Sequence, residues 1–260
     1  MSQSIADLVH GRDNNFNLIR FAAASAVLVD HSFALVADRE AATAIFDMEA
    51  LAIGRIAVDV FFIVSGFLVT RSVVNQPTLI DYAVARALRL LPALFVVCLT
   101  TAFVLGPLVT DMSPSRYFAD PRPWIYVPLT AGLVTHSLTL PGVFDTVPVA
   151  GVINSPLWTL RYEAFCYLLL ALFAAAGLLA SRRRAGTMLA LLLAFYVSVT
   201  FATDWRLESG AVDSLTRFIL DFFLGGAFYI YADKIRLQFP IVLLLAAFAL
   251  LAFGTPLCEA

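Results

Sequence analysis

Long apolar stretches recur along the whole chain, and they limit its fold more than any other feature of the sequence. A helix needs about 20 mostly apolar residues to cross a bilayer. The stretches that qualify are 16–36, 51–71, 89–110, 158–180, 186–203, 214–232 and 238–255. Hydrophobic residues make up 61% of the 260 residues and charged residues only 14%, so a single globule could not bury this much apolar surface. The sequence predicts an all-α fold, a polytopic transmembrane helix bundle.

A further apolar stretch, residues 123–140, is crowded by prolines, which interrupt helices. We interpret it as an interfacial or re-entrant segment, so the chain has about seven or eight spanning helices. Residues 1–15 are polar, and no signal-peptide cleavage site follows the first apolar stretch. This predicts a cytoplasmic N-terminal segment ahead of a membrane domain of residues 16–256. The chain ends abruptly after an apolar stretch, so we expect the membrane domain to be incomplete at its C-terminus.

Basic residues in the connections indicate how the helices are oriented. They form three groups, which are Arg71 with Arg86 and Arg89, the run Arg182, Arg183 and Arg184, and Lys234 with Arg236. Cytoplasmic loops are rich in Lys and Arg, and all three groups fall on one side if residues 123–140 do not cross. This predicts seven crossings and a cytoplasmic N-terminus. The net charge of −2 gives no electrostatic basis for nucleic-acid binding, and the widely spaced cysteines favour neither a zinc site nor a disulfide framework.

Charged side chains are costly inside a bilayer and are therefore functional candidates. Arg20 and His31 lie eleven positions apart in the first apolar stretch. At about 100° and 1.5 Å per residue they share one helix face and are separated by about 16 Å along the axis. Histidine is the natural general base near neutral pH, so His31 is a candidate catalytic base. The alternative is a snorkelling arginine and a histidine that only hydrogen-bonds a neighbouring helix.

Asp59 and Glu163 are two further ionisable residues in apolar stretches. In the orientation above, both lie about 8–12 Å below the outer boundary, at about the depth of His31. The three side chains could form a polar pocket for chemistry. They could equally form a structural cluster that locks the helices together, and the residues alone leave both alternatives open.

Arg86 and Arg89 are spaced i, i+3 and share a helix face at the predicted cytoplasmic end. With Arg20 they would form a basic entrance suited to a phosphate-bearing donor, although positive-inside anchoring explains them as well. Ser65 lies in a small-residue notch where a neighbouring backbone can approach, and no base is evident beside it. Trp158, at a helix start, is by default a membrane-interface anchor.

Four motifs stand in the order found in a known family. They are residues 17–20 (Asn-Leu-Ile-Arg) followed after ten residues by His31, 58–68 (Val-Asp-Val-Phe-Phe-Ile-Val-Ser-Gly-Phe-Leu), 86–92 (Arg-Ala-Leu-Arg-Leu-Leu-Pro) and 155–163 (Ser-Pro-Leu-Trp-Thr-Leu-Arg-Tyr-Glu). This set resembles the motifs of the acyltransferase type 3 family. Residues 140–144 (Leu-Pro-Gly-Val-Phe) are similar to a segment of family members that acetylate polysaccharides and lipid-linked sugars.

The resemblance implies an enzyme of the bacterial inner membrane that has no bound cofactor. It would transfer an acyl group, usually acetyl from acetyl-CoA, to a hydroxyl of a cell-surface glycan or a lipid-linked saccharide. By motif position, His31 would be the catalytic base and Arg20 would contact the donor. Glu163, the second catalytic residue, would position the acceptor or the imidazole of His31. Donor or acceptor binding would involve the other motif residues, Asp59, Ser65, Arg86, Arg89 and Trp158. Family members usually have about ten spanning helices, more than this chain supports.

Two other functions fit part of the sequence. A transporter or flippase for a glycan or polar solute would also place charges inside the membrane, but the sequence shows no pair of repeats or of broken helices. A non-catalytic scaffold would use the buried charges to set helix register. Transport of an unmodified solute would favour the first. Loss of folding rather than of turnover in Glu163→Gln would favour the second.

Overall fold

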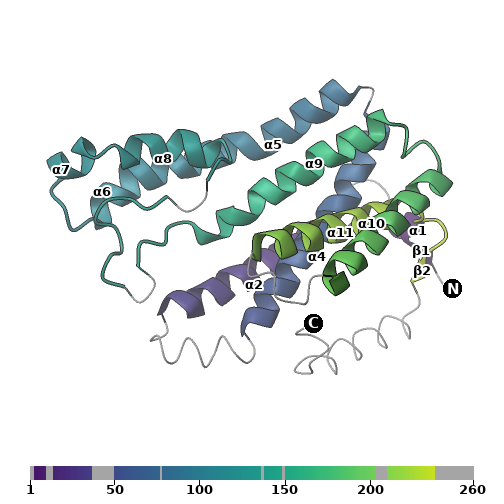
Figure 1. Ribbon diagram of the computed structural model, residues 1–260, viewed down its shortest axis with the longest axis horizontal. Coiled ribbons are helices and arrows are strands. Elements are labelled where there is room, and N and C mark those ends of the chain that lie inside the picture. The colour runs from purple at the N-terminus through teal and green to yellow at the C-terminus, as the bar shows by residue number, and fades with distance from the viewer. Residues whose placement is uncertain are drawn as a thin grey trace.

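The computed structural model describes residues 3–9, 14–36, 50–76, 78–135, 138–147, 150–202 and 210–237. Most of these residues form the long helices of Figure 1, which are α2 (Phe16–Val36), α4 (Ala50–Asn75), α5 (Leu79–Thr100), α9 (Leu160–Ala175), α10 (Arg182–Ala202) and α11 (Gly210–Ile230). The shorter helices are α1 (Ile5–Leu8), α6 (Gly106–Val109), α7 (Pro114–Ala119) and α8 (Arg122–Ala131). The strands β1 (Gln3–Ser4) and β2 (Arg236–Leu237) form a two-residue antiparallel pairing. The predicted all-α class is confirmed for the part of the chain that the structure describes.

Three helical segments of the described residues are long and apolar enough to cross a membrane, namely Ile53–Asn75, Leu79–Val109 and Ser155–Ala175. The second joins α5 to α6 through the π-helical stretch Thr101–Leu105. The third begins with the 3-10 helix Ser155–Thr159. These segments support the prediction of a helical membrane protein. The number of seven or eight spans stays a prediction, and the stretch 238–255 lies outside the described residues.

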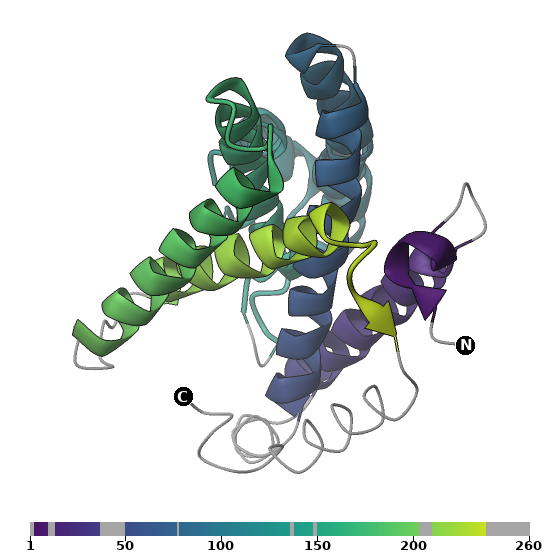
Figure 2. The ribbon, with the colours of Figure 1, turned by 90° about the vertical axis from the view of Figure 1, so that its right-hand side faces the viewer.

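Glycines let α11 approach the backbone of α4, and Figure 2 shows the two helices crossing. A Cβ added at Gly66 would lie 1.8 Å from the carbonyl oxygen of Phe222, and one added at Gly225 would lie 1.9 Å from that of Ile63. Backbones come this close only where both helices carry small residues. The crossing fixes the position of α4 along α11, and it buries Ser65 beside Gly66.

The helix α2 lies antiparallel to α4. Near the start of α2, the ring of Phe16 packs against that of Phe67, with centroids 5.0 Å apart. Near the other end, the carboxylate of Asp30 accepts a hydrogen bond from the backbone of Gly54. These contacts set which residues of α2 and α4 lie at the same level in the bundle.

The segment between α6 and α9 packs against the far part of α5 (Figure 1). Tyr117 and Tyr126 are buried in its core. The ten-residue helix α8 is about 15 Å long, too short to cross a bilayer, which is consistent with an interfacial or re-entrant segment at 123–140. Asn154, in the left-handed region at φ 54°, then turns the chain into α9. Its side chain donates a hydrogen bond of 2.7 Å to Thr101 Oγ1.

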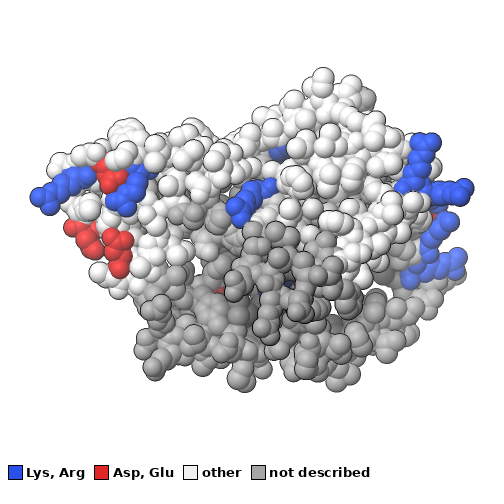
Figure 3. Space-filling model, viewed as in Figure 1, with Lys and Arg blue, Asp and Glu red and all other residues white. Residues whose placement is uncertain are grey.

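The basic connections lie together at one end of the bundle. Arg182 pairs with Asp233 at 2.8 Å, which joins the start of α10 to the end of α11. Asn75, at the end of α4, donates a hydrogen bond of 3.2 Å to the hydroxyl of Tyr229. The pairing of β1 with β2 brings the N-terminal segment to the same end. Figure 3 shows Lys and Arg gathered at this end, whereas the opposite end carries both signs of charge.

Candidate active site

Glu163 is the centre of a polar group that three helices bring together inside the bundle. Its Oε1 accepts a hydrogen bond of 2.9 Å from Ser65 Oγ of α4 and another from the hydroxyl of Tyr167, one turn further along α9. The carbonyl of Tyr167 accepts a hydrogen bond of 3.0 Å from the hydroxyl of Tyr82 in α5. Ser65, for which the sequence indicated no neighbouring base, therefore has a carboxylate beside it.

Arg20 of α2 lies near this carboxylate, and Arg86 and Arg89 of α5 lie near Arg20. We call these three residues the arginine cluster. Arg20 interacts electrostatically with both other arginines, with Glu163 and with Tyr167. The Cζ atom of Arg86 lies 6.0 Å from the ring centroid of Tyr167, a distance at which a guanidinium is attracted to an aromatic face. The Nε atom of Arg86 is buried without a hydrogen-bond partner. The structure thus brings Arg20 close to Arg86 and Arg89, as expected.

The arginine cluster carries more positive charge than the groups around it balance. The ion pairs found among the described residues use Arg122, Arg182 and Arg217, and none uses a member of the cluster. Glu163 is the one carboxylate among the described groups that act on Arg20. Unbalanced charge within an apolar bundle is costly, and a bound anion would offset that cost. Phosphate groups fit best because arginine binds them with paired hydrogen bonds.

His31 lies on the same helix as Arg20 but away from the arginine cluster. The Cζ atom of Arg20 lies 5.9 Å from the ring centroid of Phe61, one helical turn from Ser65. Arg20 is therefore at the level of Glu163, and the half-buried His31 lies about 16 Å further along α2. The expectation that Glu163 shares the depth of His31 is wrong. Hydropathy locates each span but does not fix how far one helix is shifted along another.

Asp59 belongs to a second charged group, which lies between α4 and α11. Its Oδ1 is 3.3 Å from Arg217 Nε, and the carboxyl of Asp221 interacts electrostatically with both residues. Neither Arg217 nor Asp221 was singled out from the sequence, although charges at i and i+4 within an apolar stretch are a signal of function. Asp59 precedes Ser65 by about 9 Å along α4, so this group lies between the levels of the arginine cluster and of His31.

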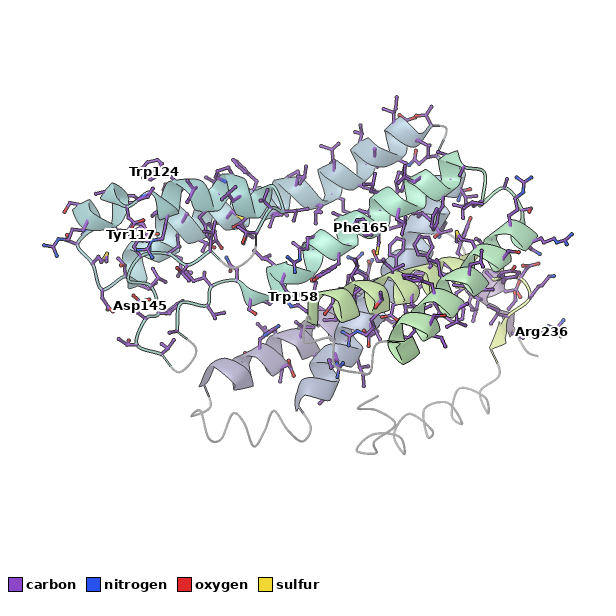
Figure 4. The ribbon with its side chains drawn as sticks, viewed as in Figure 1. Tyr117, Trp124, Asp145, Trp158, Phe165 and Arg236 are labelled. Carbon is purple, nitrogen blue, oxygen red and sulfur yellow. The ribbon has the colours of Figure 1, made fainter. Side chains whose placement is uncertain are left out.

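Trp158 packs inside the bundle at the start of α9 (Figure 4). Its ring centroid lies 5.6 Å from that of Tyr162 and 5.6 Å from that of Phe218 in α11. These contacts differ from those of a membrane-interface anchor, the default interpretation of this residue. Trp158 instead holds the first turn of α9, which carries Glu163, against α11.

Comparison with known proteins identifies the family of this chain. The sequence profile of the family described as an acyltransferase domain matches residues 13–259, and the chain belongs to this family. The resemblance derived from the four motifs is confirmed, and so is the class of enzyme, an acyltransferase.

Two relatives are similar over different shares of the chain. A protein named O-acetyl transferase, from Shigella phage Sf6, is 27% identical over 251 residues, which cover 94% of this chain and 71% of the phage protein. Nodulation protein 10 of Rhizobium leguminosarum bv. viciae is 33% identical over 172 residues, which cover 62% of this chain and 44% of that protein. No solved structure matches the chain.

Proposed function

We propose that this protein is a membrane O-acyltransferase that transfers acetyl from acetyl-CoA to a hydroxyl of a cell-surface glycan or a lipid-linked saccharide. Membership of the acyltransferase family and the name of the phage relative support the reaction type. The observation that carries the proposal is the arginine cluster, in which three cations lie close to the carboxylate of Glu163 in an apolar helical bundle.

The arginine cluster binds the phosphates of the acyl-CoA donor. Arg20 and Arg86 are half-buried and Arg89 is exposed, so the cluster can be reached from outside the bundle. It lies in the half of α5 that starts near the basic connections, which we assign to the cytoplasm together with the N-terminus. Acetyl-CoA is therefore taken from the cytoplasmic side of the bacterial inner membrane. It is a substrate, and no bound cofactor takes part.

His31 acts as the general base for the acceptor. The acceptor hydroxyl oxygen attacks the thioester carbonyl carbon while the imidazole of His31 removes the hydroxyl proton. The carbon–sulfur bond then breaks and the ester remains on the acceptor. The CoA sulfur takes the proton from His31 and leaves as the free thiol. The distance of about 16 Å between Arg20 and His31 is bridged by the extended pantetheine arm of the donor. Asp59, at an intermediate level, offers a carboxylate to acceptor hydroxyls.

Membrane vesicles that carry the chain test this function against transport. We expect radiolabelled acetyl-CoA to leave label in the extracted saccharide or lipid-linked fraction, in a form released by mild base because oxygen esters hydrolyse there. Vesicles without the chain serve as the control. Movement of the saccharide across the membrane without attached acetyl would contradict the proposal and favour a transporter or flippase.

A further inference from the structure

Glu163 and the arginine cluster stand in an unusual relation, because the carboxylate is near the cations and yet not paired with them. Glu163 acts electrostatically on Arg20. Among the described residues, however, no ion pair joins it to a cluster arginine. Attraction between opposite charges in a medium of low dielectric constant is strong, so something must hold the carboxylate in place.

Two hydroxyl groups provide that restraint. Ser65 and Tyr167 both donate hydrogen bonds to the same oxygen of Glu163, Oε1, and their hydroxyl oxygens are 3.5 Å apart. Tyr167 is fixed by the hydrogen bond from Tyr82 to its carbonyl and by the packing of Arg86 over its ring. The carboxylate is thus held beside the cations, where its negative charge acts on any anion that they bind.

We propose that Glu163 competes electrostatically with the donor phosphate for the arginine cluster, and that Ser65 and Tyr167 hold it back far enough for the phosphate to bind. This inference rests on the proposed use of acyl-CoA. Glu163 is then a positioning residue of the donor site rather than the partner of His31. Its negative charge weakens the binding of acetyl-CoA, and it speeds the release of the product CoA.

Glu163→Gln isolates the charge, because glutamine has nearly the same size and keeps an oxygen that accepts hydrogen bonds from Ser65 and Tyr167. We expect the Kd of labelled CoA and the KM of acetyl-CoA to fall by about threefold to tenfold. The pH dependence of kcat should not change. Asp233→Asn is the matched control, since it removes one exposed carboxylate at the basic end and outside the cluster, and it should leave the Kd of CoA unchanged.

Tyr167→Phe tests the restraint on Glu163, and it should change the Kd of CoA in the direction opposite to Glu163→Gln. Phenylalanine keeps the ring against Arg86 and loses only the hydroxyl that donates to Glu163. The carboxylate is then free to pair with the arginines, so the Kd of CoA should rise severalfold. In Tyr167→Phe combined with Glu163→Gln, that rise should disappear because the competing charge is gone.

Several results would overturn the inference. A Kd of CoA that is unchanged or raised in Glu163→Gln would do so. A lower kcat with a shifted pH profile in the same variant would also do so, because it would mean that Glu163 acts on the imidazole of His31. If Glu163→Gln does not insert, an unchanged Kd in Tyr167→Phe contradicts the inference by itself. Labelled CoA binding does not depend on acyl transfer. CoA binding without transfer would therefore count against the proposed function alone.

Discussion

Replacing His31 by alanine should lower the rate of acetyl transfer by about 10²–10⁴-fold, the usual contribution of a general base. The acceptor hydroxyl would keep its proton as it attacks the thioester, and no other imidazole among the described residues lies on α2. Because His31 lies about 16 Å from the level of Arg20, the Kd of CoA should be unaffected. Initial rates per inserted molecule, measured with labelled acetyl-CoA, check both expectations.

Ser32→Ala is the control for this variant. Ser32 is the exposed neighbour of His31, and among the described residues its hydroxyl donates a hydrogen bond to the carbonyl of Leu28 in its own helix. It should retain full activity. Transfer at the normal rate in His31→Ala would refute the assigned base, and an equal loss in both variants would point to damage to α2 instead of to lost chemistry.

Replacing Arg86 by glutamine should raise the KM of acetyl-CoA by about 10–100-fold, as the loss of a charge-assisted contact to phosphate predicts. The kcat at saturating donor should change little, because Arg86 lies beside Tyr167, at the level of Glu163, and away from His31. Arg86→Lys should recover part of the affinity, since it restores the charge without the planar pair of donors. Steady-state kinetics over a range of acetyl-CoA concentrations separates the two parameters.

Arg183→Gln provides the matched loss of a positive charge at the basic end of the bundle. Arg183 is exposed at the start of α10 and lies outside the arginine cluster. Its replacement should leave the KM of acetyl-CoA within about twofold of the unmodified value, because salt screens the effect of an exposed charge on a distant donor. Equal increases in Arg86→Gln and Arg183→Gln would mean that the donor responds to the general positive charge of this end and not to a built site.

The helices and the members of the arginine cluster follow from properties that the sequence displays directly. The apolar stretch 16–36 has the bounds of α2, and the stretch 51–71 lies within α4, which begins one residue earlier and ends four residues later. Both follow from the length of apolar helix that a bilayer requires. Arg86 and Arg89 share a face through the helical repeat alone. That Arg20 lies near Arg86 and Arg89 could be anticipated only because all three were placed at the same end of the membrane.

The position of one helix along another could not be read in this way. Glu163 was placed at the level of His31, and the structure places it beside Ser65 instead. That register depends on local details, such as the left-handed turn at Asn154 and the 3-10 helix that precedes α9. Arg217 was overlooked because the stretch that contains it is mostly apolar. Its ion pair with Asp59, which faces it from α4, is visible only in the structure.

The purified chain in lipid nanodiscs, given acetyl-CoA and a saccharide acceptor, provides the most direct test of the central claim. Free CoA thiol and acetylated saccharide would be measured in the same sample, the second by mass spectrometry. The account predicts that both appear only when donor and acceptor are present together, with one CoA released for each acetyl group gained by a hydroxyl. Inserted protein that releases no CoA, or that releases CoA without acetylating the saccharide, would contradict it.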